Sequence, residues 1–171
     1  SLGACVRLLL DNVTATIQLS DPEHFNTFSS DLSEHMRIAV THLQALREVT
    51  SVVLLGAGAH FSAGGNPWNM STGSSSQAAF SLLLREAYSG FLQLRSLHAP
   101  VACAAHGIVI GGGVAACMHA DLVIAEQSSL FEHGNLVRGV CPLGMLSCTF
   151  ARGLGQQTAL NVYLQNAQLN A

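Results

Sequence analysis

Two glycine breaks in apolar runs could bring backbone N–H groups beside a substrate. The first is FSAGGN, residues 61–66, and the second is AAHGIVIGGGVAACMHAD, residues 104–121. Glycine weakens a buried segment unless another group must approach the backbone closely. Each break follows a strand-like run, so Gly64-Gly65 and the glycine run at residues 111–113 could each present a backbone N–H group. Two such donors would form an oxyanion hole, although close helix–strand packing also explains the glycines.

The glycine patterns do not match nucleotide-binding loops. All seven basic residues are arginine, so the lysine of a Walker loop is absent, and so is any mechanism that needs a lysine amine from this chain. The G-x-G-x-x-G dinucleotide pattern, with its downstream acidic residue, is missing as well. A net charge of −3 and a pI near 6.2 argue against non-specific nucleic-acid binding.

Composition indicates one domain, residues 1–171, with 49% apolar and 10% charged residues. So little charge favours burial of part of the surface in an oligomer or a longer polypeptide. The five cysteines show no C-x-x-C spacing and are expected to be mostly buried thiols, which indicates a reducing, cytoplasmic location. No apolar run approaches the ~20 residues of a membrane span. The chain begins at Ser1 and ends soon after a helical pattern, so we expect a missing C-terminal piece.

The elements that position the glycines alternate between strands and helices. Strands are expected at residues 6–10, 13–19, 52–55, 101–105, 122–125 and 128–131. Helices are expected at residues 32–46 and 80–94, from the glycine run to about residue 120, and at residues 144–150 and 157–165. Asp11-Asn12 reads as a hairpin turn, and Asp31 with Glu34 resembles a helix cap. The alternation predicts βαβ units and a largely parallel sheet.

Four segments together resemble the crotonase, or enoyl-CoA hydratase/isomerase, superfamily. They are DPEHFNTFS (21–29), GAGAHFSAGGN (56–66), residues 99–125, and SLFEHGNLVRGVCPLGM (129–145). The resemblance implies an α/β fold with a crotonase-like ββα-repeat spiral core, lacking its C-terminal helical part here, and a homotrimer. It also implies an acyl thioester carried on coenzyme A or on the phosphopantetheine of an acyl carrier protein, with no other cofactor. The oxyanion N–H groups would belong to Gly65 and Gly112.

The chain departs from the family's hydratases at both water-handling glutamates. The two positions hold Ala115 and Asn135, neither of which can act as a general base. Decarboxylation forms an enolate without removing a C–H proton, so it needs the hole but no base. The motifs look most like decarboxylases of polyketide β-branching, which act on a glutaconyl-type thioester of an acyl carrier protein. Those relatives also use a loop lysine and a C-terminal histidine that this chain lacks.

Two other functions stay open. The domain could bind or scaffold acyl thioesters without catalysis, or it could be an enoyl hydratase or isomerase with a relocated base, Glu132. A solvated loop carboxylate is the competing interpretation of Glu132.

We expect a side chain at Gly112 to point into an empty substrate pocket, so that Gly112→Val abolishes activity in a folded domain.

Other candidate residues surround the predicted hole. His133 would be a catalytic proton donor or carboxylate binder beside Asn135. Histidines 60 and 106 are expected to make structural hydrogen bonds in loops, and no His pair has metal-ligand spacing. The candidate substrate-binding residues, for which packing or a surface ion pair is the alternative, are Ala63, Trp68, Met70, Gly111 and Arg138.

Overall fold

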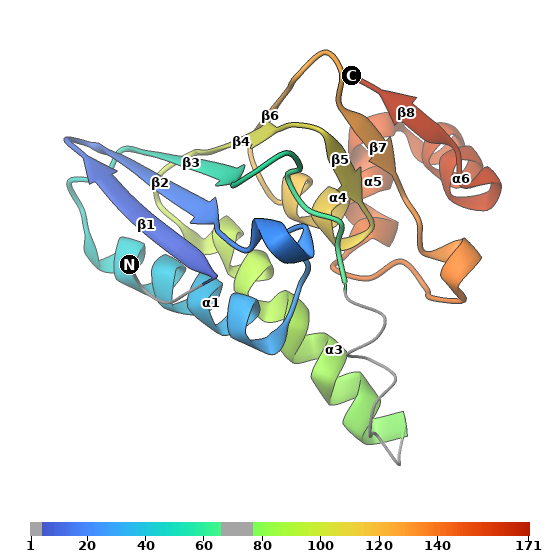
Figure 1. The fold of residues 1–171 in the computed structure, drawn as a ribbon, viewed down its shortest axis with the longest axis horizontal. Helices are drawn as coiled ribbons and strands as arrows, with labels where there is room; N and C mark the ends of the chain where they lie inside the picture. The colour runs from blue at the N-terminus through green and yellow to red at the C-terminus, as the bar shows by residue number, and fades with distance from the viewer. Residues whose placement is uncertain (1–4, 66–76) are drawn as a thin grey trace.

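The computed structural model describes residues 5–65 and 77–171, which form two sheets with helices packed against them (Figure 1). The larger sheet has the strand order β1-β2-β3-β4-β6. Its strands are β1 (Val6–Asp11), β2 (Thr14–Leu19), β3 (Ser51–Gly56), β4 (Val101–Ala105) and β6 (Leu122–Ala125). The β1–β2 pair is antiparallel and the other pairs are parallel, which confirms the predicted α/β class and the N-terminal hairpin.

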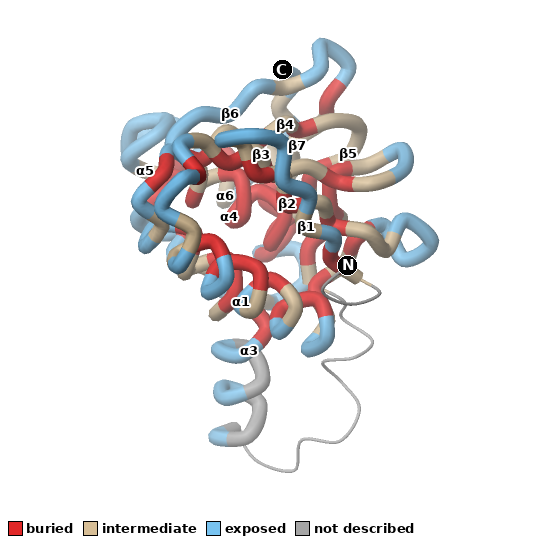
Figure 2. Tube along the Cα trace, turned by 90° about the vertical axis from the view of Figure 1, so that its left-hand side faces the viewer, coloured by how far each residue is buried: buried red, intermediate tan, exposed pale blue. Residues whose placement is uncertain are grey.

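Two long helices, α1 (Ser30–Ala45) and α3 (Gln77–Leu92), lie side by side against one face of this sheet (Figures 1 and 2). The buried residues of α1 recur at helical spacing, as the sequence predicts. Its cap differs from the prediction, because the Ser29 side chain accepts a hydrogen bond from the Leu32 N–H at 3.1 Å. Asp31 instead lies in the first turn of the helix.

A second sheet with the order β5-β7-β8 carries the glycine run. Its strands are β5 (Ile108–Ile110), β7 (Leu130–Glu132) and β8 (Gln168–Asn170). The sequence indicates a strand before the glycine run without giving the bounds of β5, and it does not predict β8, because three residues are too few to show an alternating pattern. The short helix α4 (Gly112–Cys117) follows β5, and α5 (Leu146–Leu154) and α6 (Gln156–Gln165) pack nearby. The 3₁₀ turns are η1 (Pro22–His24), η2 (Gln93–Ser96) and η3 (Leu136–Arg138).

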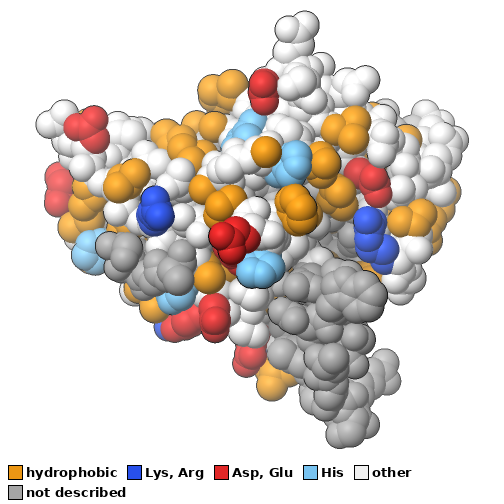
Figure 3. All heavy atoms as spheres, viewed as in Figure 1, with side chains coloured by type: hydrophobic (Ala, Val, Ile, Leu, Met, Phe, Trp, Pro, Cys, Tyr) orange, Lys and Arg blue, Asp and Glu red, His pale blue; other side chains and the backbone are white. Residues whose placement is uncertain are grey.

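The last strand of the larger sheet, β6, is largely exposed (Figure 2). Leu122, Val123 and Ile124 of β6 are 56%, 38% and 60% exposed. Figure 3 likewise shows hydrophobic side chains spread among few charged ones on the visible face. In the described residues, no helix is long and apolar enough to cross a membrane.

Candidate active site

The two glycine breaks pack directly against each other. Ser62 forms a parallel bridge with Val109, and the Ile110 N–H donates to the Ser62 carbonyl at 3.0 Å. Gly64 has a φ of +80°, and a Cβ there would collide with the Ile110 carbonyl and lie 2.7 Å from the Gly112 nitrogen. A Cβ on Gly113 would in turn collide with the Ser62 carbonyl. Close backbone packing is therefore one reason for both breaks, and it brings the two segments together.

The predicted donors Gly65 and Gly112 are placed by this packing. Phe28 bridges to Gly65 and donates its N–H to the Gly64 carbonyl at 2.7 Å, so the Gly65 N–H points away from Phe28. Gly112 opens α4, where a helix has no internal acceptor for its N–H groups. Among residues 5–65 and 77–171, no hydrogen bond engages either N–H. The structure thus brings the two segments together, and their role as an oxyanion hole stays a prediction.

The space beside Gly112 is filled, contrary to the sequence-based expectation. A Cβ there would lie 2.8 Å from the Phe28 ring and 3.0 Å from the Tyr88 hydroxyl oxygen. Phe28 is stacked on Phe91 with ring centroids 4.0 Å apart, so it is not free to move aside. The expectation that Gly112→Val enters an empty pocket is wrong, because the new side chain would displace this aromatic cluster.

The side chains near the glycine turn are neutral. Ala115 is buried, and a Cβ on Gly144 would lie 2.9 Å from both the Ala115 Cβ and the Tyr88 ring. Asn135 donates its Nδ2 to the Cys141 carbonyl at 2.9 Å. That bond leaves its Oδ1 facing Gly111, at 3.1 Å from where a Cβ would stand. Neither Ala115 nor Asn135 can therefore accept a proton from carbon.

Gly111 is held in the conformation that starts α4. Its φ of +51° favours glycine, and its N–H donates to the Glu132 carbonyl at 3.0 Å. The structure brings Gly111 next to Asn135, and their roles in substrate binding and catalysis stay predictions.

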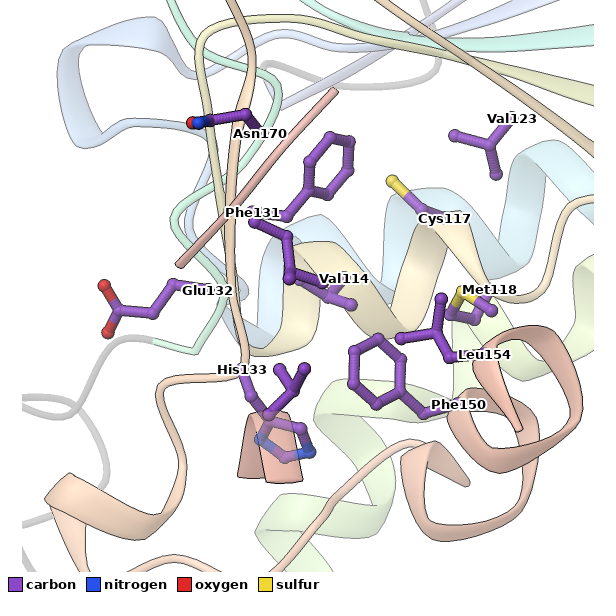
Figure 4. A pocket seen from close by; sticks show the side chains of 12 residues that line it. Val114, Cys117, Met118, Val123, Phe131, Glu132, His133, Phe150, Leu154 and Asn170 are labelled. Atoms are coloured by element: carbon purple, nitrogen blue, oxygen red, sulfur yellow. The ribbon is translucent and has the colours of Figure 1, made fainter. Parts of the chain in front are cut away.

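The Glu132 carboxylate points away from the apolar side chains drawn with it in Figure 4, and it takes part in a hydrogen-bond network. It accepts hydrogen bonds from Asn166 at 3.1 Å and from Gln168 at 3.3 Å, and it pairs with Arg138 at 3.4 Å. Burial pushes the pKa of Glu132 up, but these three hydrogen bonds outweigh it and lower the pKa. Arg138 also donates to the Gly134 carbonyl at 2.6 Å. Its ion pair with Glu132 is the alternative to substrate binding that the sequence left open for Arg138. A carboxylate stabilised in its charged form is a poor general base.

His133 borders a largely apolar cavity of about 200 Å³ (Figure 4). Its ring meets Phe150 and Tyr163 edge-on, with centroids 5.5 and 4.8 Å away. Burial lowers the pKa of His133, so the ring is neutral at pH 7. Within the described residues, its buried Nδ1 has no hydrogen-bond partner. A neutral ring among aromatic side chains is poorly suited to hold a carboxylate, and its catalytic role stays a prediction.

The remaining predicted residues lie in loops. The Ala63 N–H donates to the Phe25 carbonyl at 3.0 Å, next to the first glycine break. His60 accepts from the Ile108 N–H at 3.3 Å, and the His106 ring bonds the Gly58 carbonyl at 3.1 Å, which confirms their structural hydrogen bonds. The candidates Trp68 and Met70 fall outside the described residues.

Sequence reasoning missed the fully buried Asn26, which has a φ of +51°. Its Nδ2 donates to the carbonyls of residues 57, 60 and 61, at 2.9, 2.9 and 3.1 Å. Its Oδ1 accepts from the Asp21 N–H at 2.8 Å. The Ser62 hydroxyl donates to the Asn26 carbonyl at 2.8 Å and accepts from the Gly64 N–H at 3.1 Å. Asn26 thus positions the first glycine break, and only its place in a turn-like stretch, HFNTF, hinted at this.

The cysteines and other metal-ligating groups do not form a metal site. In the described part of the chain, no three His, Cys, Asp or Glu side chains gather to hold an ion. Cys103 and Cys117 are buried as expected, whereas Cys141 and Cys148 are exposed. The expectation that most of the thiols are buried is therefore wrong.

Comparison with known proteins decides the family. The sequence profile described as enoyl-CoA hydratase/isomerase matches residues 11–171. The chain belongs to this family. The family assignment agrees with the paired glycine breaks and with the two-sheet fold.

Individual relatives are considerably longer than this chain. A probable enoyl-CoA hydratase, EchA14, of Mycobacterium tuberculosis is 30% identical over 90% of this chain and 59% of its own length. A probable enoyl-CoA hydratase of Rhodobacter capsulatus is 28% identical over 97% of this chain and 63% of its own length. The chain thus spans about three-fifths of these curated relatives.

Solved structures show the same fold. An enoyl-CoA hydratase from Polaromonas superposes with a TM-score of 0.90 at 23% identity, over 97% of this chain and 65% of its own. A putative enoyl-CoA hydratase from Thermobifida fusca, in complex with acetoacetyl-CoA, superposes with a TM-score of 0.87 at 22% identity, over 98% and 69%. These likenesses support the crotonase fold inferred from the sequence motifs.

Proposed function

We propose that this chain is the core of an acyl-thioester enzyme that stabilises an enolate with the Gly65 and Gly112 N–H groups. The reaction that fits best is decarboxylation of a glutaconyl-type thioester on an acyl carrier protein, as in polyketide β-branching. Loss of CO₂ leaves negative charge that moves onto the thioester oxygen, where two N–H donors stabilise it. This reaction uses no cofactor besides the carrier.

The observation that carries the proposal is that the described residues place no free base beside the predicted hole. Ala115 is buried against neutral groups, the Asn135 amide is held by the Cys141 carbonyl, and Glu132 is tied to its own network. Hydration needs a group that activates water, and an isomerase needs one that removes a C–H proton. Decarboxylation needs neither, because the departing carboxylate supplies the electron pair.

The carrier is the second part of the proposal. The chain offers no lysine and only seven arginines to hold the phosphates of coenzyme A, which favours a protein-bound pantetheine arm. Complexes of the Thermobifida relative with CoA and acetoacetyl-CoA favour coenzyme A instead. Both carriers present the same thioester and pantetheine arm to the hole.

A hydratase is the second candidate because the relatives are named probable enoyl-CoA hydratases. A domain that binds thioesters without turnover is the third. Mass spectrometry of a panel of acyl thioesters, each on both carriers and incubated with the protein, separates all three. Loss of CO₂ supports the proposal, a gain or loss of water supports a hydratase, and binding without a mass change supports the third candidate.

We expect Glu132→Gln to leave turnover within about twofold of wild type. The hydrogen bonds of the Glu132 carboxylate lower its pKa, so we do not expect it to act as the general base of the reaction. Steady-state rates at pH 7 check this, and a loss of about 100-fold or more would instead identify an enzyme with a relocated base. The carboxylate's stabilisation is present above the unfolded pKa of about 4.3 and is lost as pH falls through the lower folded pKa. Urea unfolding should therefore show a weaker acid dependence in the variant.

We also propose that the protein assembles as a homotrimer, as the family resemblance implies. The low content of charged residues and the exposed apolar strand β6 support burial of surface between copies. Light scattering coupled to size exclusion measures the assembly, and a monomer at high concentration would contradict it.

A further inference from the structure

We propose that Tyr88 is the proton donor of this site and that its hydroxyl protonates the carbon of the enolate held by Gly65 and Gly112. The inference rests on the proposed function, because it needs an enolate at that hole. Tyr88 lies in α3, and its hydroxyl oxygen stands 3.0 Å from where a Cβ on Gly112 would be. That Cβ and the Gly112 nitrogen share one Cα, so the hydroxyl lies within roughly 5.5 Å of the nitrogen. A thioester oxygen bound about 2.9 Å from that nitrogen would therefore lie within roughly 8.5 Å of the hydroxyl, in the same site.

The surroundings of Tyr88 do not otherwise explain a hydroxyl on this ring. The residue is 6% exposed, and its ring meets Phe28 edge-on with centroids 5.5 Å apart. Ala115 and Gly144 lie on another side of the same ring. In residues 5–65 and 77–171, no hydrogen bond engages the hydroxyl, and its oxygen is not among the buried polar atoms that lack a partner. The ring is packed while its hydroxyl is unengaged beside Gly112, so the hydroxyl is free to meet a substrate bound there.

The ring is also held firmly enough to aim the hydroxyl. Gly144 has a φ of +57°, and a Cβ there would lie 2.9 Å from the Tyr88 ring. Phe28, which touches Tyr88, is itself stacked on Phe91. A proton donor fixed by packing on two sides meets the positional requirement of general acid catalysis.

The proton and electron balance of the step is complete. The bond between the substrate carboxylate carbon and its neighbouring γ-carbon breaks, CO₂ leaves, and the electron pair moves through the C=C bond onto the thioester oxygen. The Tyr88 O–H bond then breaks, and its proton forms a C–H bond at the α- or γ-carbon. The electron pair returns from the oxygen to that carbon, and the phenolate takes a proton from water as the product leaves.

The acidity of Tyr88 suits this cycle. Burial raises the pKa of Tyr88 to about 12, so the group is a neutral phenol throughout the working pH range. Its conjugate phenolate regains a proton from water readily. The raised pKa also makes Tyr88 unsuitable as a resting-state base, in agreement with a reaction that needs none.

Tyr88→Phe tests the proposal because it removes the hydroxyl and retains the ring. Tyr163→Phe, which alters the only other tyrosine of the chain, is the matched control. The substrate is glutaconyl-pantetheine, and the readouts are the CO₂ release rate, the ratio of 2-enoyl to 3-enoyl product by NMR, and the melting temperature. We expect Tyr88→Phe to lose about 100-fold in turnover and to shift the product ratio towards that of dienolate protonated by water. Both variants should melt like the wild type.

Two results would overturn the proton-donor assignment. One is a wild-type rate and product ratio in Tyr88→Phe. The other is a lower rate with an unchanged ratio, which would make Tyr88 an extra hydrogen-bond donor to the oxygen.

A binding measurement tests whether the Tyr88 hydroxyl reaches a bound enol, and it does not depend on turnover. If the wild type releases no CO₂, the proposed decarboxylation fails but this measurement still tests the role of Tyr88. Acetoacetyl-pantetheine has an enol form that places an oxygen at the hole. We expect its Kd to rise about tenfold in Tyr88→Phe and to stay unchanged in Tyr163→Phe. Equal Kd values in all three proteins would show that the hydroxyl does not reach the bound enol and would overturn the assignment.

Discussion

Asn26→Asp should destabilise the protein by about 4 kcal/mol at neutral pH, with the loss growing as pH rises. The substituted carboxylate would place a negative oxygen where Nδ2 now donates to three carbonyls, in a residue that is fully buried. Its pKa in the folded state must therefore rise well above the unfolded value of about 3.9. Stability relative to wild type is then highest below that value and falls by about 1.4 kcal/mol per pH unit until the folded pKa is passed.

Urea unfolding of wild type and variant at pH 4.5, 6 and 7.5 measures this slope. Asn12→Asp is the matched control, because Asn12 has a similar φ of +53° but lies in the exposed hairpin turn. It should change stability by less than about 1 kcal/mol at every pH. If Asn26→Asp followed the wild-type curve over this range, the amide would not be the donor that holds these carbonyls.

The same variant should also lose activity while still folded at low pH. The Ser62 hydroxyl links the Asn26 carbonyl to the Gly64 N–H, so movement of Asn26 is transmitted to the first glycine break. A catalytic geometry tolerates little displacement, and an error of about 1 Å can cost roughly 100-fold in rate.

The sequence predicts the elements whose pattern is long enough to be periodic. The apolar spacing of α1 and the compact run of β3 both specify buried faces, and both are found where expected. The hairpin follows from Asp11-Asn12 for the same local reason, since turn chemistry lies in adjacent residues. The family resemblance adds the prediction that Gly65 and Gly112 supply the two oxyanion N–H groups.

Contacts between distant segments are not encoded in such local patterns. The three-residue strand β5 exists because β7 and the Ser62 bridge pair with it. Tyr88 lies 24 positions before Gly112 in the numbering, in a helix whose pattern marks it only as a position near the core. The Asn26 side chain bonds carbonyls more than 30 positions away, as its separations of 31, 34 and 35 show. Tertiary packing alone creates these relations.

Gly64→Ala should cost about 3 kcal/mol in stability and abolish turnover, because two separate requirements meet at this residue. Its φ of +80° is one that alanine rarely adopts, and a Cβ would collide with the Ile110 carbonyl and stand 2.7 Å from the Gly112 nitrogen. Backbone atoms cannot rotate aside as a flexible side chain can. The two breaks would have to separate, which moves the Gly65 N–H relative to the Gly112 N–H.

Gly155→Ala separates the two requirements, because Gly155 has the same φ of +80° with nothing within 4 Å of its Cβ position. It should lose only the conformational part, about 2 kcal/mol because its ψ of 150° lies in a region that is essentially restricted to glycine, with turnover unchanged. Urea unfolding and thioester turnover of both variants give the comparison. The difference between the two losses in unfolding free energy gives the energetic cost of forcing a Cβ between the two glycine breaks. Equal losses, or full turnover in Gly64→Ala, would mean that the breaks do not need this contact and that the oxyanion hole does not depend on it.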